Sequence, residues 1–134
     1  MAPFLFLFLF VIVDFGIALD RRITLQHAVR EGARITAVEV NPADGIDATV
    51  DQAQGLVEAA DVSVCFIDQD GSGAPNTMEP VKVSLTYEYK YTVPFASLLS
   101  ALGIPSSFKI DMDPSATAAL ENDPGAGGTF TECP

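Results

Sequence analysis

An acidic, glycine-rich segment at residues 68–76 holds the residue types that could bind a metal ion. It begins Asp-Gln-Asp-Gly-Ser-Gly, so Asp68 and Asp70 present carboxylates two positions apart. Glu79 stands at the twelfth position counted from Asp68, where an EF-hand calcium loop carries its bidentate glutamate. An EF-hand also needs further oxygen ligands and a helix on each side, whereas this segment is flanked by strand-like patterns. We predict a glycine-rich hairpin turn without a metal, with calcium binding at 68–76 as the alternative.

The other reactive residues form no catalytic pattern. His27 is the only histidine, and it lies in a charged helical stretch with no serine or cysteine nucleophile placed for it. Asp111 and Asp113 lie two apart on one face of a predicted strand, whereas acid–base catalysis uses carboxylates in contrasting environments. The sequence also has no phosphate-binding loop. It therefore predicts no enzyme, no catalytic residue, no cofactor and no small-molecule substrate.

A hydrophobic run opens the chain and contains one acid, Asp14. The 17 residues from Pro3 to Leu19 would form about 25 Å of helix, the short end of what spans a bilayer. We predict a transmembrane anchor; the competing interpretation, a cleavable signal peptide, lacks a preceding basic residue and a small-residue cleavage site. An acid inside a membrane is expensive unless it is paired or near the interface. Asp14 is therefore expected either near the headgroups or paired with a basic group on a neighbouring helix.

The helical pattern continues past this run. Apolar and small residues keep helical spacing, which predicts one helix from about Phe4 to Val38, ended by Asn41-Pro42. Asn41 and Pro42 have the residue types of a helix start, and the spacing that follows predicts a second helix to about residue 60. We divide the chain into an anchor and amphipathic helix at 1–38 and an α+β domain at 39–134.

Alternating patterns predict the strands of a small antiparallel sheet packed on the second helix. The strands are expected at 61–67, 81–93 and 107–112, with a possible continuation at 116–121. The apolar segment 95–104, bracketed by prolines, could cap the sheet, enter the membrane or contact a partner. The tail after residue 121 is predicted to be loop unless Cys133 fixes it. The expected fold class is α+β.

Charge and cysteines bound the remaining possibilities. Residues 39–134 hold three lysines against fifteen acids, a net charge of −12, which excludes nucleic acid as a partner. The four arginines after the apolar run would keep the domain in the cytoplasm by the positive-inside rule, whereas the acidic surface and the cysteines favour export. Cys65 and Cys133 lack metal-site spacing, so they are either a disulfide, favoured in an exported domain, or two inert thiols.

Three stretches together carry a family resemblance. They are Pro3 with the apolar run and Val-Asp-Phe-Gly at 13–16, Arg-Glu-Gly-Ala-Arg at 30–34, and the strand 81–95 followed by a final strand ending at Glu121. With them the chain resembles a TadE-like protein, a minor pilin-like component of the tight adherence (Flp-type) pilus system. The residues expected to serve structure or assembly are Asp14, Gly16, Arg30, Glu31, Gly32 and Arg34.

The resemblance implies a pilin-like domain behind a single-pass helix in a bacterial membrane, facing away from the cytoplasm. It implies a non-enzymatic role in pilus assembly, surface adhesion and biofilm formation, with other pilin-like and secretion-platform subunits as partners. Members of the family carry a basic leader and a small residue with a Glu before the proline, where this sequence has Met1-Ala2. The departure predicts a start site upstream, a truncated chain or an unprocessed member.

Overall fold

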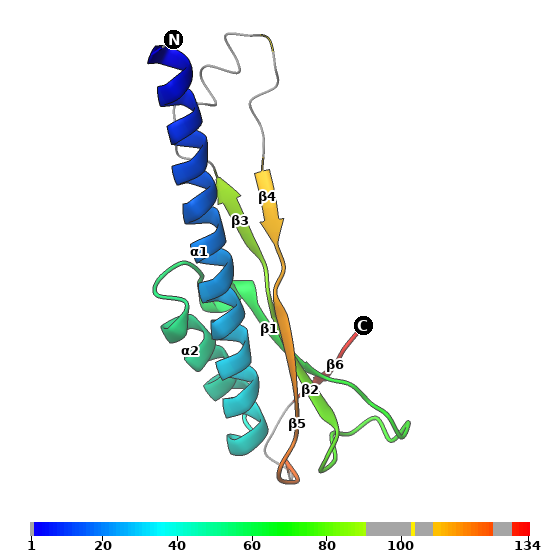
Figure 1. Ribbon diagram of the computed structural model, residues 1–134. Coiled ribbons are helices and arrows are strands. Elements are labelled where there is room, and N and C mark those ends of the chain that lie inside the picture. Colours follow the sequence, from blue (N-terminus) through cyan, green and yellow to red (C-terminus); the bar gives the residue numbers. More distant parts are fainter. Residues whose placement is uncertain (1, 91–102, 104–108, 125–129) are drawn as a thin grey trace. The chain divides into compact units, whose positions relative to one another are not determined.

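The computed structural model describes residues 2–90, 103, 109–124 and 130–134, and it has the predicted α+β class (Figure 1). Its described residues form two α-helices, a short 3-10 helix at Ala59–Asp61, and six strands. Strands β5, β2, β1 and β6 make one sheet in that order, and β3 and β4 make a second. The chain divides into two compact units: the first contains 1–23 and 88–112, the second 24–87 and 113–134. Each unit is described by itself below.

Helix α1 (Ala2–Glu39) confirms the predicted continuous helix, and its residues up to Ile23 belong to the first unit. It ends where Val40 takes a left-handed φ of 55°. Within the described part of the chain, no helix is long and apolar enough to cross a membrane. The transmembrane part of the prediction is thus not confirmed.

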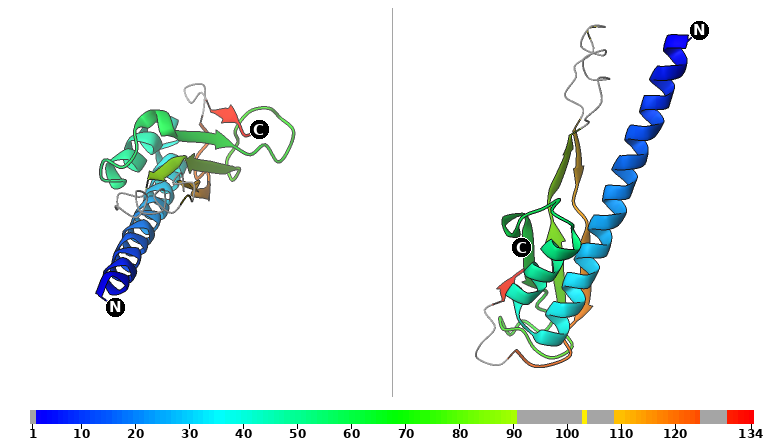
Figure 2. Two further views of the ribbon diagram at one scale, coloured as in Figure 1. Left: turned by 90° about the horizontal axis from the view of Figure 1, so that it is seen from above. Right: turned by 90° about the vertical axis from the view of Figure 1, so that its left-hand side faces the viewer.

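In the second unit, α2 (Pro42–Gln52) lies beside the C-terminal part of α1 (Figures 1 and 2). Its start matches the prediction: the Asn41 side chain accepts a hydrogen bond from the N–H of Ala43 at 3.1 Å, and Pro42 follows. The predicted extension to residue 60 is wrong. The backbone turns left-handed at Gln54 and Gly55, with φ values of 56° and 78°, which a continuing α-helix does not tolerate.

The four-stranded sheet is mixed rather than purely antiparallel. Strand β1 (Val62–Phe66) pairs antiparallel with β2 (Pro80–Leu85), and β2 pairs antiparallel with β5 (Ser115–Ala119). Strand β6 (Thr131–Glu132) pairs parallel with β1, so the end of the tail is not loop. Alternate residues of β1 and β2 form the core face: Val62, Val64, Phe66, Val81, Val83 and Leu85.

The long strand predicted at 81–93 is wrong in one respect, because the structure divides it at Thr86. The N–H of Thr86 donates to the carbonyl of Asp61 instead of continuing either ladder. Strand β3 (Tyr87–Lys90) then pairs with β4 (Lys109–Met112), where the Lys109 ammonium meets the Glu88 carboxylate at 2.7 Å. Of the strand predicted at 107–112, residues 109–112 form β4, and residues 107–108 lie outside the described residues. Of the continuation predicted at 116–121, residues 116–119 belong to β5. Residues 91–93 and almost all of the segment 95–104 lie outside the described residues.

Candidate assembly surfaces along helix α1

Asp14 is buried in the first unit by the chain's own second sheet. Only 5% of its surface is exposed, and its Oδ1 accepts a hydrogen bond from the Tyr89 hydroxyl at 3.0 Å. The guanidinium of Arg21, two turns along α1, lies over the Tyr89 ring at 5.7 Å from its centre. The Arg21 cation is attracted to the face of the Tyr89 ring, while the hydroxyl of the same ring donates to the Asp14 carboxylate. Sequence reasoning thus missed the partner of Asp14, which is Tyr89 on β3.

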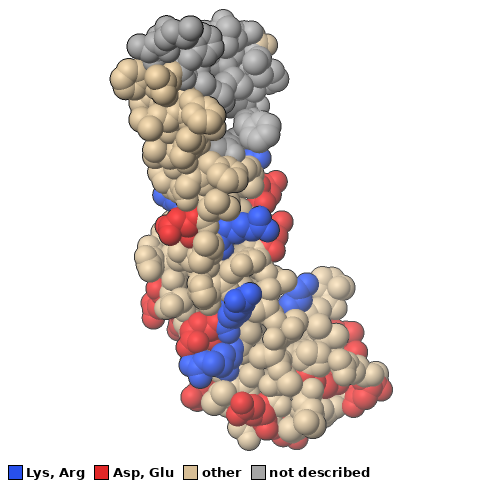
Figure 3. Space-filling model, in the orientation of Figure 1, with Lys and Arg blue, Asp and Glu red and all other residues tan. Residues whose placement is uncertain are grey.

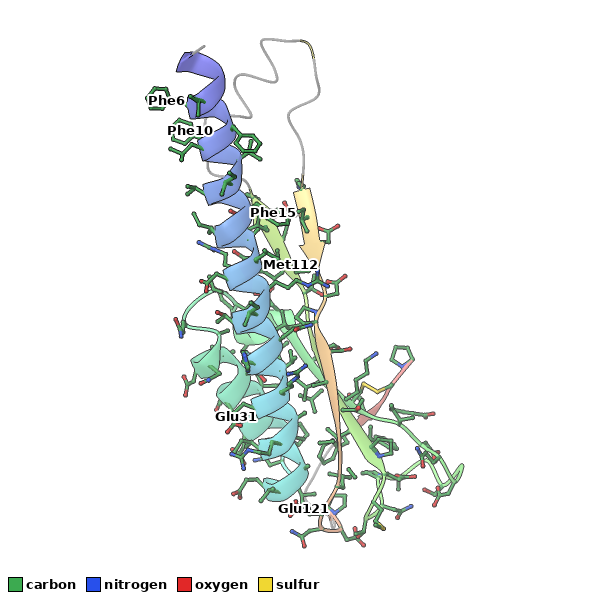
Figure 4. The ribbon with its side chains drawn as sticks, viewed as in Figure 1. Phe6, Phe10, Phe15, Glu31, Met112 and Glu121 are labelled. Carbon is green, nitrogen blue, oxygen red and sulfur yellow. A yellow bond between two sulfur atoms is a disulfide. The ribbon has the colours of Figure 1, made fainter. Side chains whose placement is uncertain are left out.

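The outer surface of the same part of α1 is apolar and exposed. Phe6 exposes 62% of its surface, and Phe6 and Phe10 project outward from the helix (Figure 4). The exposed large apolar residues here are Leu5, Phe6, Phe8, Leu9, Phe10, Val11, Ile12, Val13, Phe15, Ile17 and Leu19. We call these residues the apolar surface of α1. Single exposed apolar residues are ordinary, but a contiguous group of this kind marks a surface that a partner or a lipid covers.

Gly16 opens a notch in the apolar surface of α1. It is exposed, and a Cβ built on it would meet no atom within 4 Å. Residues one turn away on a helix are its neighbours, and here they include Ile12 and Leu19, both large and exposed. The missing side chain therefore lets another backbone approach α1 at this point.

Gly32, by contrast, serves contact between helices within the chain. A Cβ on Gly32 would overlap Oγ1 of Thr49 on α2 and lie 2.8 Å from the carbonyl oxygen of Gly45. A Cβ on Gly45 would in turn overlap Oγ1 of Thr36 on α1. Each threonine hydroxyl donates to the carbonyl of the glycine four residues before it, at 2.8 Å in α1 and 2.7 Å in α2. The repeated Gly-x-x-x-Thr spacing was the sequence signal for this crossing, and only its first glycine was singled out.

Glu31 and Arg34 form an exposed ion pair on α1. Two guanidinium nitrogens of Arg34 donate to the two carboxylate oxygens of Glu31, at 3.0 and 2.6 Å. The hydrogen bond from Arg34 lowers the pKa of the Glu31 carboxyl, and the same contact raises the pKa of Arg34. Because both groups are exposed, the pair contributes little to stability.

Arg30 and Arg34 also border a groove of about 360 Å³ between α1 and the outer strand β5. Its lining from α1 is completed by Ala33 and Ala37, and from the other side by residues 116–119 and Glu121. The small side chains on both walls leave the groove open. Arg30, Arg34 and β5 are thus brought together by the fold, which the sequence pattern alone did not indicate.

The acidic loop brings three carboxylates together, and its own backbone N–H groups donate hydrogen bonds to two of them. Single carboxylate oxygens of Asp68, Asp70 and Glu79 lie within 4.8 Å of one another. Asp68 accepts hydrogen bonds from the backbone N–H groups of Asp70, Gly71 and Gly73, and the last of these is the main cause that lowers its pKa. Glu79 is buried and accepts from the N–H groups of Gln69 and Asn76. These backbone donors stabilise the Asp68 and Glu79 carboxylates without an ion.

The two cysteines of the chain are joined to each other. Cys65 on β1 and Cys133 after β6 form a disulfide across 68 positions of sequence. The Cys133 N–H also donates to the carbonyl of Phe66 at 2.9 Å, which extends the β1–β6 pairing. His27, Asp111 and Asp113 are exposed.

The comparison with protein families matches the part of α1 described above. A family model for TadE-like proteins matches residues 1–34. The matched TadE-like segment includes all six residues expected to serve structure or assembly, and it confirms the resemblance seen in the sequence. It indicates a part in the tight adherence pilus system. No curated protein and no solved structure matches the chain.

Proposed function

We propose that this protein is a membrane-associated, pilin-like subunit that serves the assembly of a tight adherence pilus, with its C-terminal domain outside the cytoplasm. Its role is structural rather than catalytic, and its contribution to adhesion and biofilm formation follows from the pilus. Its partners are other pilin-like and secretion-platform subunits, which cover the apolar surface of α1 together with lipid.

The observation that carries this proposal is the coincidence of the TadE-like match with the apolar surface of α1. The match covers residues 1–34, and the exposed large apolar side chains fall at 5–19 within it. Monomeric soluble proteins rarely expose a contiguous apolar surface of this kind, so the surface supports association through α1. The notch at Gly16 gives an approaching helix room near the C-terminal end of that surface.

The acidic domain supports the same arrangement. Fifteen acids against three lysines in 39–134 repel anionic headgroups, which keeps the domain in water while α1 associates. The Cys65–Cys133 disulfide fits an oxidising compartment outside the cytoplasm.

Site-specific photo-crosslinking in a bacterium that makes tight adherence pili tests the proposal. A photoreactive amino acid at Phe10 should give crosslinks to pilin-like or secretion-platform subunits, whereas the same group at Asp51, exposed on α2, should not. Phe10→Lys should reduce surface pili, with Asp51→Lys as the matched control. Unchanged pili in Phe10→Lys, together with recovery of the wild-type protein free of membranes and of pilus subunits, would refute the assignment.

The alternative is a calcium-dependent binding module at residues 68–76. The clustered carboxylates of Asp68, Asp70 and Glu79 are the observation in its favour. Against it, five backbone N–H groups already donate to Asp68 and Glu79. A calcium titration distinguishes the two: we expect millimolar calcium to leave the Tm unchanged, and a rise of several degrees would favour the alternative.

A further inference from the structure

The outer strand β5 has an open edge that faces the groove beside α1. In the four-stranded sheet β5 pairs only with β2, so one side of its backbone has no strand partner among the described residues. Natural sheets protect such edges with charged residues, proline or bulges. The sequence of β5, Ser-Ala-Thr-Ala-Ala, has no charge and no proline, so the strand itself carries neither of these protections.

Two hydrogen bonds at the ends of the β2–β5 ladder reveal which backbone groups face outward. Leu85 N–H donates to the carbonyl of Pro114, and Leu120 N–H donates to the carbonyl of Glu79. Hydrogen-bonded pairs recur at every second residue in an antiparallel ladder, so Ala116 and Ala118 direct their backbone groups to β2. The N–H and C=O groups of Ser115, Thr117 and Ala119 must then point away from β2.

Helix α1 already uses the next outward group along this edge. The N–H of Glu121, two residues beyond Ala119, donates to the carbonyl of Ala37 at 3.1 Å. The contact brings the C-terminal end of α1 against the chain after β5, and the groove extends from there toward Arg30. Arg30 is seven residues before Ala37, about 10 Å along a helix. The edge is therefore closed at one end and open along Thr117 and Ala119.

The charges of the groove are unequal along its length. Arg34 is paired with Glu31, whereas Arg30 makes no ion pair with a described residue. Glu121 lies at the closed end, beside the end of α1 (Figure 4). Figure 3 shows basic side chains next to acidic ones over the lower half of the molecule, on a surface that is mostly uncharged. The open part of the groove thus offers a positive charge to whatever lies along β5.

We infer that β5 and this groove bind an extended, acidic peptide segment of a partner protein by strand addition. The segment's backbone pairs with the outward groups of Thr117 and Ala119, its small side chains lie between the alanines of α1 and β5, and one carboxylate meets Arg30. This inference concerns the second unit alone and does not depend on the apolar surface of α1.

The experiment uses a linear peptide library displayed on phage, panned on the full-length, disulfide-intact chain in detergent micelles. Thr117→Pro removes an outward N–H and leaves the β2 ladder intact, because proline is tolerated on an edge when its nitrogen faces away from the sheet. The selected peptides should be rich in Asp and Glu, and Thr117→Pro should weaken their binding about tenfold. Arg30→Glu should also weaken binding, whereas Arg22→Glu, an exposed α1 charge outside the groove, should not.

Folding controls keep the test decisive. Thr117→Pro should retain the wild-type Tm, and Ala118→Pro should lower it because that N–H faces β2. A library that yields no binders, or binders that Thr117→Pro and Arg30→Glu leave unaffected, overturns the proposal. So does sedimentation in which the wild type self-associates through β5 and Thr117→Pro is monomeric, because the occupant would then be a second copy.

Discussion

The hydroxyl of Tyr89 on β3 donates a hydrogen bond to the buried carboxylate of Asp14 on α1, 75 residues earlier in the chain. The contact gives the one acid of the apolar run a partner inside its own chain. A carboxylate that is 5% exposed is expensive to bury, so this donor holds β3 and α1 together within the first unit.

Tyr89→Phe should therefore destabilise the first unit by about 1–3 kcal/mol, because it leaves the Asp14 carboxylate buried without that hydroxyl. Hydrogen exchange of the β3 and β4 amides in detergent measures this loss. A double-mutant cycle with Asp14→Leu gives the control: Tyr89→Phe should matter much less once the carboxylate is gone. Equal effects of Tyr89→Phe in both backgrounds would show that the two residues are not coupled.

The two glycines of the TadE-like segment should respond oppositely to alanine. Gly32→Ala places a Cβ against Thr49 and the Gly45 carbonyl, so it should destabilise the second unit by about 1–3 kcal/mol. Gly16→Ala meets open space within a helix and should stabilise α1 by up to about 1 kcal/mol. Thermal melts of both variants decide the matter. A Gly32→Ala protein as stable as wild type would mean that α1 and α2 can move apart at no cost.

The glycine variant that stabilises the subunit, Gly16→Ala, should nevertheless impair pilus assembly. Gly16→Ala fills the notch in the apolar surface of α1 and should reduce pilus assembly, although it leaves the subunit stable. Counting surface pili at equal protein levels separates this effect from unfolding. Wild-type pili in Gly16→Ala would remove Gly16 from the assembly contact.

Sequence reasoning succeeded where one local signal decided the outcome. The helical spacing of residues 4–38 and the Asn41-Pro42 start were enough for α1 and the beginning of α2. The prediction for α2 failed at its end, because spacing continues through Gly55 while the backbone does not. Glycine lowers the stability of a helix by only about 1 kcal/mol relative to alanine, so the apolar spacing took precedence over Gly55 in the prediction. In the structure, the left-handed turn at Gln54 and Gly55 ends the helix.

The missed contacts are those that depend on tertiary placement. Alternation in 81–93 indicates a strand but not that its two parts join different sheets, a division made by the Thr86–Asp61 hydrogen bond. The partner of Asp14 could not be found from spacing. Tyr87, Tyr89 and Tyr91 alternate along 81–93, so all three share one face of the predicted strand. Gly32 was recognised, but its contact required the second Gly-x-x-x-Thr in α2.

The Cys65–Cys133 disulfide should contribute about 4 kcal/mol to stability, because it closes a loop of 68 positions and so restricts the unfolded chain. Replacing both cysteines by serine should lower the Tm and free the end of the tail. Chemical denaturation of the oxidised protein against the double variant measures the difference, and Ser63→Ala on the same strand serves as a control for local changes. Equal stabilities would show that the β1–β6 pairing holds the tail without the bond.

The acid sensitivity of the loop is fixed by Asp68. The N–H of Gly73, with those of Gly71 and Asp70, holds the pKa of the Asp68 carboxyl below its ordinary value of 3.8. A lowered pKa in the folded state means that ionised Asp68 stabilises the fold at neutral pH. This contribution is complete above the unfolded-state pKa and is lost as the pH falls through the folded-state pKa.

Asp68→Asn should therefore lower the Tm at neutral pH and converge with the wild type as the pH falls below about 4. Thermal melts between about pH 2 and 7 give the comparison, with Asp51→Asn, an exposed acid on α2, as the control. A gap between Asp68→Asn and wild type that stays constant down to the lowest pH would mean that the carboxylate's charge does not hold the loop. In that case the hydrogen bonds from the N–H groups of Gly71 and Gly73 would stabilise the fold equally with Asp68 ionised or protonated. The pKa of Asp68 would then not be lowered by folding.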